Sequence, residues 1–321
     1  MLNQYLMMMK YNCLYCYQQL DGQIDFHEKC SKQFFGTNEA PKLVNTLEEM
    51  ADLAKQIVER SVAVPGVQPK ISMSIIKEKS EKTENRLTVV GALGGNYILK
   101  PPSMIFPEMP GNEHVTMRIA EAFGLNVVQS SLIRLKSGEL SYITKRIDRS
   151  PKGMKIHMID MFQITEAFDK YKSSMEKVGK ALLEHSDNTL LDALFFFELT
   201  LFSFVTGNND MHLKNFSMIK TSSGWSLAPA YDLLNVRIAN PEDKEELALT
   251  LGGKKRKFTR AYFERFADGL GLNQKQIQGV FKRFEKNKPK AIHWINQSFL
   301  SQEMKNEYLD LLEERYRIFI V

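Results

Sequence analysis

The chain has 321 residues, a formal net charge of +5 and 43% hydrophobic residues. This length predicts two domains or one large bilobal domain, and the apolar content is sufficient for a sizeable core. So mild a positive charge does not by itself indicate a nucleic-acid-binding protein. No apolar run reaches the roughly 18 residues that span a bilayer, and residues 1–10 lack the pattern of a secretory signal. The sequence therefore predicts a cytoplasmic protein with no membrane partner.

All three cysteines lie near the start of the chain. They occur as Cys13-x-x-Cys16, followed by His27-x-x-Cys30. Three thiolates and one imidazole in two close pairs form a tetrahedral ligand set that suits structural zinc. The alternative is three ordinary reduced thiols. We expect a zinc-knuckle-like module over residues 1–40. The aromatic residues predicted to form its small core are Tyr11, Tyr17, Phe26, Phe34 and Phe35.

Residues 41–149 are predicted to form a mixed α/β lobe. Thr46 and Glu49 have the spacing of a helix capping box, ahead of a helix expected over 47–59. A second helix is expected over 112–123. The strands that alternation and turn residues predict are 71–75, 86–90, 96–100, 127–135 and 140–145.

A glycine-containing turn, residues 64–70, precedes the first predicted strand. Gly66 allows a close backbone approach to an anion, and Lys70 supplies positive charge. The residue order of a Walker A loop is absent, so a plain hairpin turn is the alternative. Farther on, Lys100 closes a predicted strand, either as an ordinary exposed lysine or as the phosphate-contacting lysine of a nucleotide-binding lobe. Glu113 on the next helix is either its ion-pair partner or a charge that favours the helix dipole.

Residues 150–321 are predicted to form a mostly helical lobe. Residues 146–149 form the expected hinge before it, with backbone groups available to an adenine edge. One helix is expected to open at Asp160 and another at Ser173 or Ser174, and residues 216–219 and 225–228 are expected to pair as a hairpin. The remaining predicted helices cover 188–204, 260–270, 274–287, 290–299 and 302–318.

The central stretch of this lobe is Gly207-Asn208-Asn209-Asp210-Met211-His212-Leu213-Lys214-Asn215-Phe216, which follows the apolar run 193–205. Asp210 and Asn215 have the Asp-x-x-x-x-Asn spacing of kinase catalytic loops. Asp232 supplies a second carboxylate, and such hard oxygen ligands hold magnesium against ATP phosphates. The spacing alone arises by chance about once in a chain of this length, so a solvated turn is the alternative.

Taken in order, these motifs resemble the HipA family of serine/threonine protein kinases, which act as toxins of bacterial toxin–antitoxin systems. The resemblance covers about residues 45–270 and implies an α+β, bilobal kinase fold that is distantly similar to lipid kinases. The segments that carry it are Val64 to Lys70, Ile98 to Pro101, Asn112-Glu113, Arg146 to Arg149, Gly207 to Phe216 and Tyr231 to Leu233.

The resemblance also implies roles for single residues. Asp210 is the expected catalytic base, and Asn215 and Asp232 are the expected magnesium ligands. His212 and Lys214 are expected to support the loop or the charge of the transition state. The residues expected at the ATP site are Val67, Gln68, Lys70, Lys100, Glu113, Lys145, Arg146 and Ile147.

Partners follow from the resemblance as well. Family members phosphorylate cytosolic proteins such as aminoacyl-tRNA synthetases, which stalls translation. They are held by a helix-turn-helix antitoxin, so contact with DNA is expected only through that antitoxin. The chain is shorter than the long members and is similar to the short, HipT-like form, in which a small HipS-like chain is a separate protein.

The chain departs from the family pattern in its first half. Ala63 occupies the position where the family often carries an autophosphorylated serine, which makes Ser61 the nearby candidate. The Cys/His module is absent from the best-known members. Two other functions stay open: a small-molecule phosphotransferase, and a zinc-containing binding module with a degenerate kinase body. The presence of Lys100, Asp210, Asn215 and Asp232 argues against the degenerate binding module.

Overall fold

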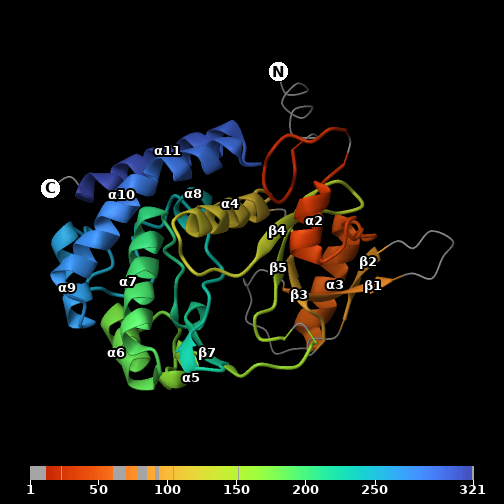
Figure 1. The fold of residues 1–321 in the computed structure, drawn as a ribbon. Coiled ribbons are helices and arrows are strands. Elements are labelled where there is room, and N and C mark those ends of the chain that lie inside the picture. Colours follow the sequence, from red (N-terminus) through yellow and green to blue (C-terminus); the bar gives the residue numbers. More distant parts are fainter. Residues whose placement is uncertain are drawn as a thin grey trace. The chain divides into compact units, whose positions relative to one another are not determined.

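The computed structural model describes most of the chain, drawn as coloured ribbon in Figure 1. The predictions made for Tyr11, Ser61, Val67 and Gln68 lie outside the described residues. Within those residues, no helix is both long and apolar enough to cross a bilayer. The described ranges are 12–22, 24–60, 70–77, 85–90, 94–103, 105–150 and 152–319.

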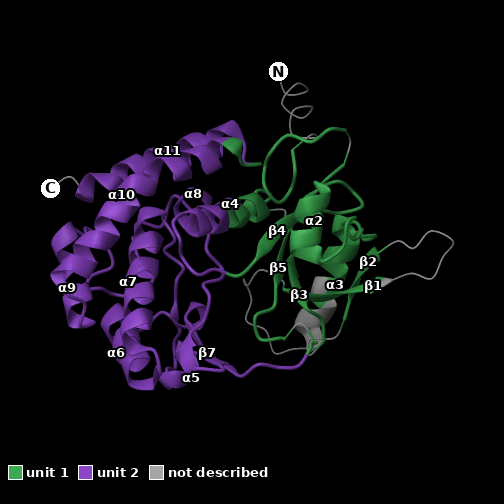
Figure 2. Cartoon of the chain, viewed as in Figure 1, with its two compact units in different colours: residues 1–114, 128–153, 297–299 green, residues 115–127, 154–296, 300–321 purple. Residues whose placement is uncertain are grey.

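The chain forms two compact units, which Figure 2 distinguishes by colour. The first unit takes in residues 1–114, 128–153 and 297–299. The second takes in residues 115–127, 154–296 and 300–321. Residues 115–127, which fall inside the predicted lobe 41–149, therefore group with the second unit.

The first unit is built on a five-stranded antiparallel sheet with the order β2-β1-β3-β5-β4. Alternating apolar residues bury one side of each strand, and the most buried of them include Ile71, Leu87, Leu99, Leu132 and Ile143. All five predicted strands are confirmed, with β4 shorter than expected. The strands are β1 Ile71–Lys77, β2 Asn85–Val89, β3 Tyr97–Lys100, β4 Ser130–Arg134 and β5 Leu140–Lys145.

Helices α2 Glu28–Phe35 and α3 Leu47–Arg60 belong to the first unit, whereas helix α4 Met109–Ala122 begins in the first unit and ends in the second. The predicted capping box of α3 is confirmed, because the Thr46 amide donates to Glu49 Oε2 at 2.9 Å and the Glu49 amide donates to Thr46 Oγ1 at 3.3 Å. Helix α4 begins three residues earlier than predicted. Pro110 is tolerated there because the first-turn amides of a helix have no intrahelical partner.

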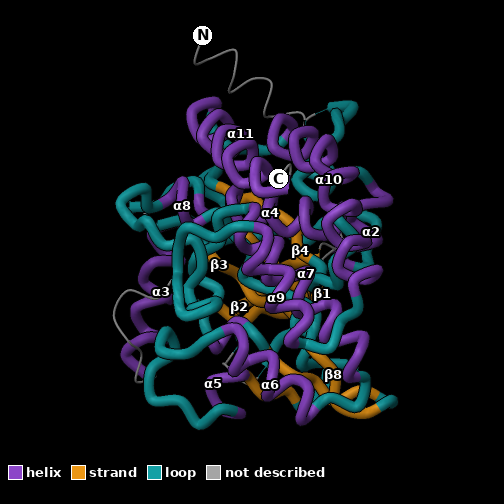
Figure 3. Tube along the Cα trace, turned by 90° about the vertical axis from the view of Figure 1, so that its left-hand side faces the viewer, coloured by secondary structure: helices purple, strands orange, loops and turns teal. Residues whose placement is uncertain are grey.

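The second unit is mostly helical, as predicted, and its long helices surround α7. Its small sheet has the order β6-β7-β8 and contains the predicted hairpin. Figure 3 shows β8 beside α6. The helices are α5 Met161–Ile164, α6 Met175–His185, α7 Thr189–Val205, α8 Val236–Ala239, α9 Arg260–Gly269, α10 Gln274–Gln297 and α11 Gln302–Tyr316, and the strands are β6 Met158–Asp160, β7 Ser217–Thr221 and β8 Gly224–Leu227.

Helix α10 corrects one prediction. The sequence predicted two helices separated before residue 290, whereas α10 continues through Pro289. A proline inside a helix removes one backbone hydrogen bond and crowds the preceding turn. Here the side chains on both sides of the proline, Phe284 and Ile295, are fully buried, so packing of both halves outweighs that loss. The predicted break was wrong because tertiary packing, not local propensity, decided the helix.

Helix α7 is the centre of the second unit. It is apolar on all sides, which is typical of a helix surrounded by protein. Its few hydroxyl side chains bond back into the helix: Thr200, Ser203 and Thr206 donate at 2.8 Å to carbonyls four residues earlier. The helix therefore buries no free hydroxyl on these three side chains.

Gly207 directly follows Thr206, the C-cap of α7, and has φ +68°. The Asn208 amide donates to the Ser203 carbonyl at 2.8 Å, and the Gly207 amide donates to the Phe204 carbonyl at 3.3 Å. This pair of bonds is the Schellman motif. A Cβ at residue 207 would clash with Leu311 and would lie 2.8 Å from Asn235 Oδ1, so both the backbone and the packing require glycine.

We therefore expect Gly207→Ala to lower the free energy of unfolding by about 3 kcal/mol, since it combines left-handed strain with overpacking. Gly279→Ala is the matched control. Gly279 lies in α10 with nothing within 4 Å of an added Cβ, and we expect that change to stabilise by about 1 kcal/mol. Urea unfolding of both variants measures the difference, and equal stabilities would contradict the packing described.

Candidate functional site

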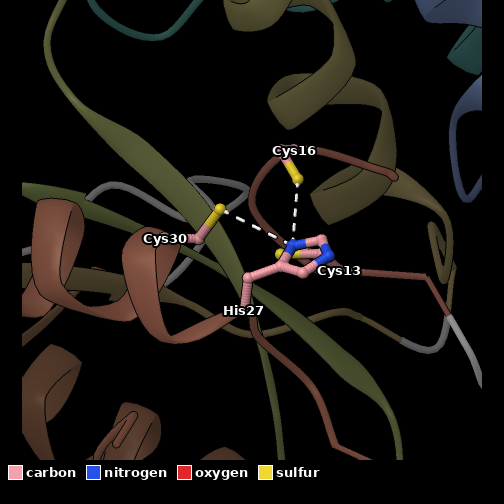
Figure 4. Close-up of side chains that lie close together, drawn as sticks. All are labelled: Cys13, Cys16, His27 and Cys30. Carbon is pink, nitrogen blue, oxygen red and sulfur yellow. Dashed lines mark hydrogen bonds between the residues drawn. The ribbon is translucent and has the colours of Figure 1, made fainter. Parts of the chain in front are cut away.

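The four predicted metal ligands of the first unit lie together. Figure 4 shows the side chains of Cys13, Cys16, His27 and Cys30 converging on one point. Their ligand atoms all lie within 4.8 Å of one another. His27 Nδ1 is 3.4 Å from Cys16 Sγ and 3.8 Å from Cys30 Sγ. Tetrahedral zinc with ordinary bond lengths places nitrogen and sulfur about 3.5 Å apart, so the donor set fits a structural metal ion.

The orientation of His27 supports this fit. Its Nε2 donates to the Gln19 carbonyl at 3.0 Å, which places the ring proton on Nε2 and leaves the Nδ1 lone pair facing the sulfur atoms. Metal-binding histidines are usually oriented in this way by a bond from the other ring nitrogen. Four protein ligands leave no open coordination position, so the arrangement suits a structural role rather than catalysis.

The Cys/His module packs on the five-stranded sheet. Phe34 and Phe35 lie 5.9 and 6.1 Å from the ring of Tyr97 on β3. Asp25 accepts hydrogen bonds of 3.0 to 3.3 Å from the guanidinium of Arg134 on β4. The predicted aromatic core of the module is therefore continuous with the core of the first unit.

Lys100 and Glu113 form an ion pair inside the first unit, as predicted. Lys100 Nζ donates to Glu113 Oε1 at 2.6 Å, and the two side chains are 4% and 1% exposed. The ammonium also lies 5.3 Å from the centre of the Tyr142 ring. Strand β3 supplies the lysine and helix α4 the glutamate, so the pair fixes one end of the strand against the helix.

The other described residues of the predicted ATP site have different environments. Lys145 Nζ donates to Gln129 Oε1 at 2.7 Å, and burial lowers the pKa of Lys145. Arg146 binds both carboxylate oxygens of Asp148, at 2.9 and 2.7 Å. Lys70 is exposed at the start of β1, and Ile147 is half-buried. The nucleotide role of these four residues stays a prediction.

The loop after α7 holds the predicted catalytic residues of the second unit. Asn215 Nδ2 donates to the Asp210 carbonyl at 3.0 Å, and the His212 amide donates to the same carbonyl at 2.8 Å. Asn215 ends the single turn of 3-10 helix Leu213–Asn215 and is 7% exposed. Its amide nitrogen is thus used within the loop, which leaves Oδ1 as the atom that can ligate a cation.

Asp232 belongs to the same region. It has φ +57°, a left-handed conformation that aspartate tolerates better than most residues. The preceding Tyr231 donates through its hydroxyl to the Lys214 carbonyl at 2.9 Å, which ties the Asp232 segment to the loop. Lys214 itself is exposed, and its ammonium lies 4.7 Å from the centre of the Phe162 ring.

His212 is buried. Burial lowers the pKa of His212, the Lys170 ammonium lowers it further, and the Asp210 and Asp232 carboxylates oppose this shift. Lys170 Nζ lies 3.0 Å from His212 Nε2. An ammonium only donates, so Nε2 accepts and the ring proton lies on Nδ1. No described residue accepts a hydrogen bond from that Nδ1.

Two residues of this site, Lys170 and Tyr171, were missed by the sequence analysis. The Tyr171 hydroxyl donates to Asp210 Oδ1 at 2.7 Å. Both residues lie in the loop Thr165–Ser173 between α5 and α6, about forty residues before Asp210. No spacing rule connects them with the later loop, so only the tertiary structure reveals the contact.

The buried ion pair generates a stability prediction. Glu113→Gln leaves the Lys100 charge buried without its carboxylate, and we expect a loss of about 3–5 kcal/mol in the free energy of unfolding. The double variant Lys100→Met/Glu113→Leu removes both charges and should regain much of that loss. Glu313→Gln is the control: its ion pair with Lys288 is largely exposed and should matter by less than about 1 kcal/mol. Equal effects of the two single changes in urea unfolding would refute this.

Comparison with known proteins gives one family and several relatives. The HipA-like C-terminal domain family matches residues 62–292. A Haemophilus influenzae protein named "Putative kinase" is 27% identical over 307 residues, which are 86% of each chain. The Shewanella oneidensis protein named "Serine/threonine-protein kinase toxin HipA" is 24% identical over 255 residues, which cover 72% of this chain and 56% of that protein.

A solved structure agrees in fold. A chain in the complex of Shewanella oneidensis HipA, HipB and operator DNA superposes with a TM-score of 0.66 at 20% identity, covering 86% of this chain and 71% of that one. This likeness confirms the predicted α+β, bilobal HipA-like fold. The family match extends over well more than half of the residues of this chain, so the chain belongs to the HipA-like C-terminal domain family.

Proposed function

We propose that this protein is an ATP- and magnesium-dependent serine/threonine protein kinase of the HipA type. The observation that carries the proposal is the loop after α7, in which the Asn215 side chain is bonded to the Asp210 backbone. That bond holds the Asn215 carboxamide against the Asp210 backbone. The two residues have the order and spacing of the Asp and Asn in kinase catalytic loops. Membership in a family whose relatives carry kinase names supports the same activity.

The oxygen atoms of Asn215 and Asp232 are the proposed magnesium ligands. Carboxylate and carboxamide oxygens are the hard ligands that magnesium prefers in proteins. When bound, the ion would offset the negative charge of the nucleotide phosphates. Tyr231 holds the Asp232 segment to the loop through the Lys214 carbonyl, so the two ligands come from segments that are tied together.

Asp210 is the proposed base. It accepts the proton of the attacking hydroxyl, a role that typically contributes 10²- to 10⁴-fold in rate. The Nδ1–H of His212 is a donor that can support developing charge. Lys100, held by Glu113 in the first unit, is the proposed contact for ATP phosphates; Val67, Gln68 and Lys70 are proposed to cover the nucleotide.

The cellular role follows the family. We propose a cytoplasmic toxin whose substrate is a cytosolic protein such as an aminoacyl-tRNA synthetase, restrained by a helix-turn-helix antitoxin and completed by a small HipS-like chain. The solved complex of a HipA with HipB and operator DNA supports an antitoxin partner of this kind. Ser61 is the proposed autophosphorylation residue. A small-molecule phosphotransferase remains the competing activity that the first experiment separates.

The Cys/His cluster is proposed to bind one structural zinc ion. The convergence of four ligand atoms and the outward bond of His27 Nε2 support this. The ion would join Cys13 and Cys16 to the start of α2, where His27 and Cys30 lie. Because the aromatic core of the module continues into the sheet, loss of the ion is expected to weaken the whole first unit.

The kinase proposal predicts that Asp210→Asn lowers phosphate transfer by about 10²- to 10⁴-fold, while binding of magnesium-ATP survives. The measurement uses radiolabelled ATP, magnesium and a bacterial lysate, followed by separation of labelled proteins. A protein band labelled only by the wild type supports a protein kinase. ATP consumption without any labelled protein would instead indicate a small-molecule acceptor.

Asp310→Asn is the matched control for this experiment. Asp310 is an exposed residue of α11, and its change removes the same charge away from the catalytic loop. The control should label the same band as the wild type. Calorimetry of magnesium-ATP binding to Asp210→Asn then separates loss of catalysis from loss of the nucleotide site; equal transfer by the two variants would rule out Asp210 as the base.

The zinc proposal predicts one zinc ion per purified chain by elemental analysis. His27→Gln should reduce the zinc content to well below one equivalent and lower the melting temperature, since a structural zinc contributes directly to folding. His293→Gln, which changes an exposed histidine of α10, should alter neither. A protein that holds no zinc after purification in metal-replete medium would show that the cluster is a group of reduced thiols.

A further inference from the structure

The loop between α5 and α6 reaches the predicted catalytic base. This loop, Thr165–Ser173, contains no helix or strand. The Tyr171 hydroxyl donates to Asp210 Oδ1 at 2.7 Å. A hydroxyl hydrogen-bonded to the base is the arrangement that an acceptor hydroxyl must adopt before it transfers its proton.

Tyr171 is held in this position from several sides. Its ring packs edge-on against His212, with ring centres 5.1 Å apart. The Lys170 ammonium lies 4.9 Å from the centre of the same ring, and the Lys170 carbonyl accepts a 3.1 Å bond from the Leu213 amide. The tyrosine is thus attached to the catalytic loop by its neighbour, its ring and its hydroxyl together.

The hydroxyl keeps its proton at neutral pH. Burial raises the pKa of Tyr171, and the hydrogen bond and charge of Asp210 raise it further. The group therefore donates to the carboxylate over the physiological range and does not repel it. A bond between a neutral hydroxyl and a carboxylate is among the stronger hydrogen bonds in proteins.

The loop also has features of a segment that can be displaced. Glu166 has φ +49°, a left-handed conformation that costs free energy in a residue other than glycine. Tyr171 is still 39% exposed, so an incoming molecule can reach its ring from solvent. The contacts named above hold residues 165–173 to the catalytic loop. They are polar contacts and an edge-on ring contact, and they do not form a buried apolar interface.

We propose that Tyr171 occupies the acceptor-hydroxyl position on Asp210 and that a protein substrate must displace it before its own serine or threonine hydroxyl can bind. The proposal rests on the proposed kinase function and adds a regulatory contact to it. Tyr171 is a competitor for the site, not a phosphate acceptor. Protein substrates that displace the loop are selected over free hydroxyl compounds, which lack the binding surface to do so.

The test compares phosphate transfer from magnesium-ATP to dephosphorylated casein by four proteins: wild type, Tyr171→Phe, Tyr262→Phe and Asp210→Asn. Removal of the competing hydroxyl should lower the KM for casein about tenfold and change kcat by less than twofold. The reason is that casein no longer has to displace the Tyr171 hydroxyl from Asp210. Tyr262→Phe removes a hydroxyl from a tyrosine of α9 and should behave as the wild type.

Three outcomes would overturn the proposal. An unchanged KM in Tyr171→Phe would show that the contact does not compete with substrate. A lower kcat would show instead that Tyr171 positions Asp210 for catalysis. Phosphotyrosine at residue 171, found by mass spectrometry of the wild type after incubation with ATP, would make Tyr171 an acceptor.

The same experiment separates this proposal from the kinase function itself. If wild type transfers phosphate and Asp210→Asn does not, the kinase function stands whatever Tyr171→Phe does. If none of the four proteins transfers phosphate to casein or to a protein of the bacterial lysate in a manner that depends on Asp210, the kinase function fails and the competition proposal fails with it. Unfolding curves of Tyr171→Phe and wild type should coincide within about 1 kcal/mol, the usual range for a partly exposed hydrogen bond, so a loss of activity from misfolding is recognised.

Discussion

The apolar helix α7 and the way it ends determine the geometry of the second unit. A helix that is apolar on all sides has to be surrounded, and α6, α9, α11 and β8 contact it. It cannot continue into the polar loop that follows without a sharp change of direction. Gly207 provides that change through a left-handed residue and two carbonyl-capping bonds. The residues that follow emerge from a rigid core in a fixed direction.

The polar residues of the loop are then fixed by local bonds. Asn215 and the His212 amide both bond to the Asp210 carbonyl, and Tyr231 brings in the segment of Asp232 through the Lys214 carbonyl. Each of these bonds ends on a backbone carbonyl, not on the carboxylate of Asp210 or Asp232. Functional sites commonly lie on loops whose backbone is held in place by a rigid scaffold.

The first unit contains a buried ion pair and a Cys/His cluster. The ion pair of Lys100 and Glu113 is buried almost completely, so each charge depends on the other for its stability. The Cys/His cluster instead brings the Cys13–Cys16 turn to the start of α2, and the aromatic rings of α2 contact Tyr97 of the sheet. A small module of this kind gains its order from ligands and from a neighbour.

The sequence by itself determined the features that depend on local spacing. Alternation located all five strands of the first sheet, the capping box located the start of α3, and short ligand spacings placed Cys13, Cys16, His27 and Cys30 in one set. The kinase spacing of Asp210 and Asn215 was also visible, because both residues lie on one loop. These features are encoded within a few residues of each other, where backbone geometry alone limits what the side chains can do.

Only the tertiary structure decided the rest. The continuity of α10 through Pro289 depended on packing by Phe284 and Ile295, which local propensity does not contain. The contact of Tyr171 with Asp210 joins residues that are 39 positions apart in the sequence. Folding brings such segments together through burial of the apolar core, and the polar contacts that result are set by the shape of that core, not by any repeat in the chain.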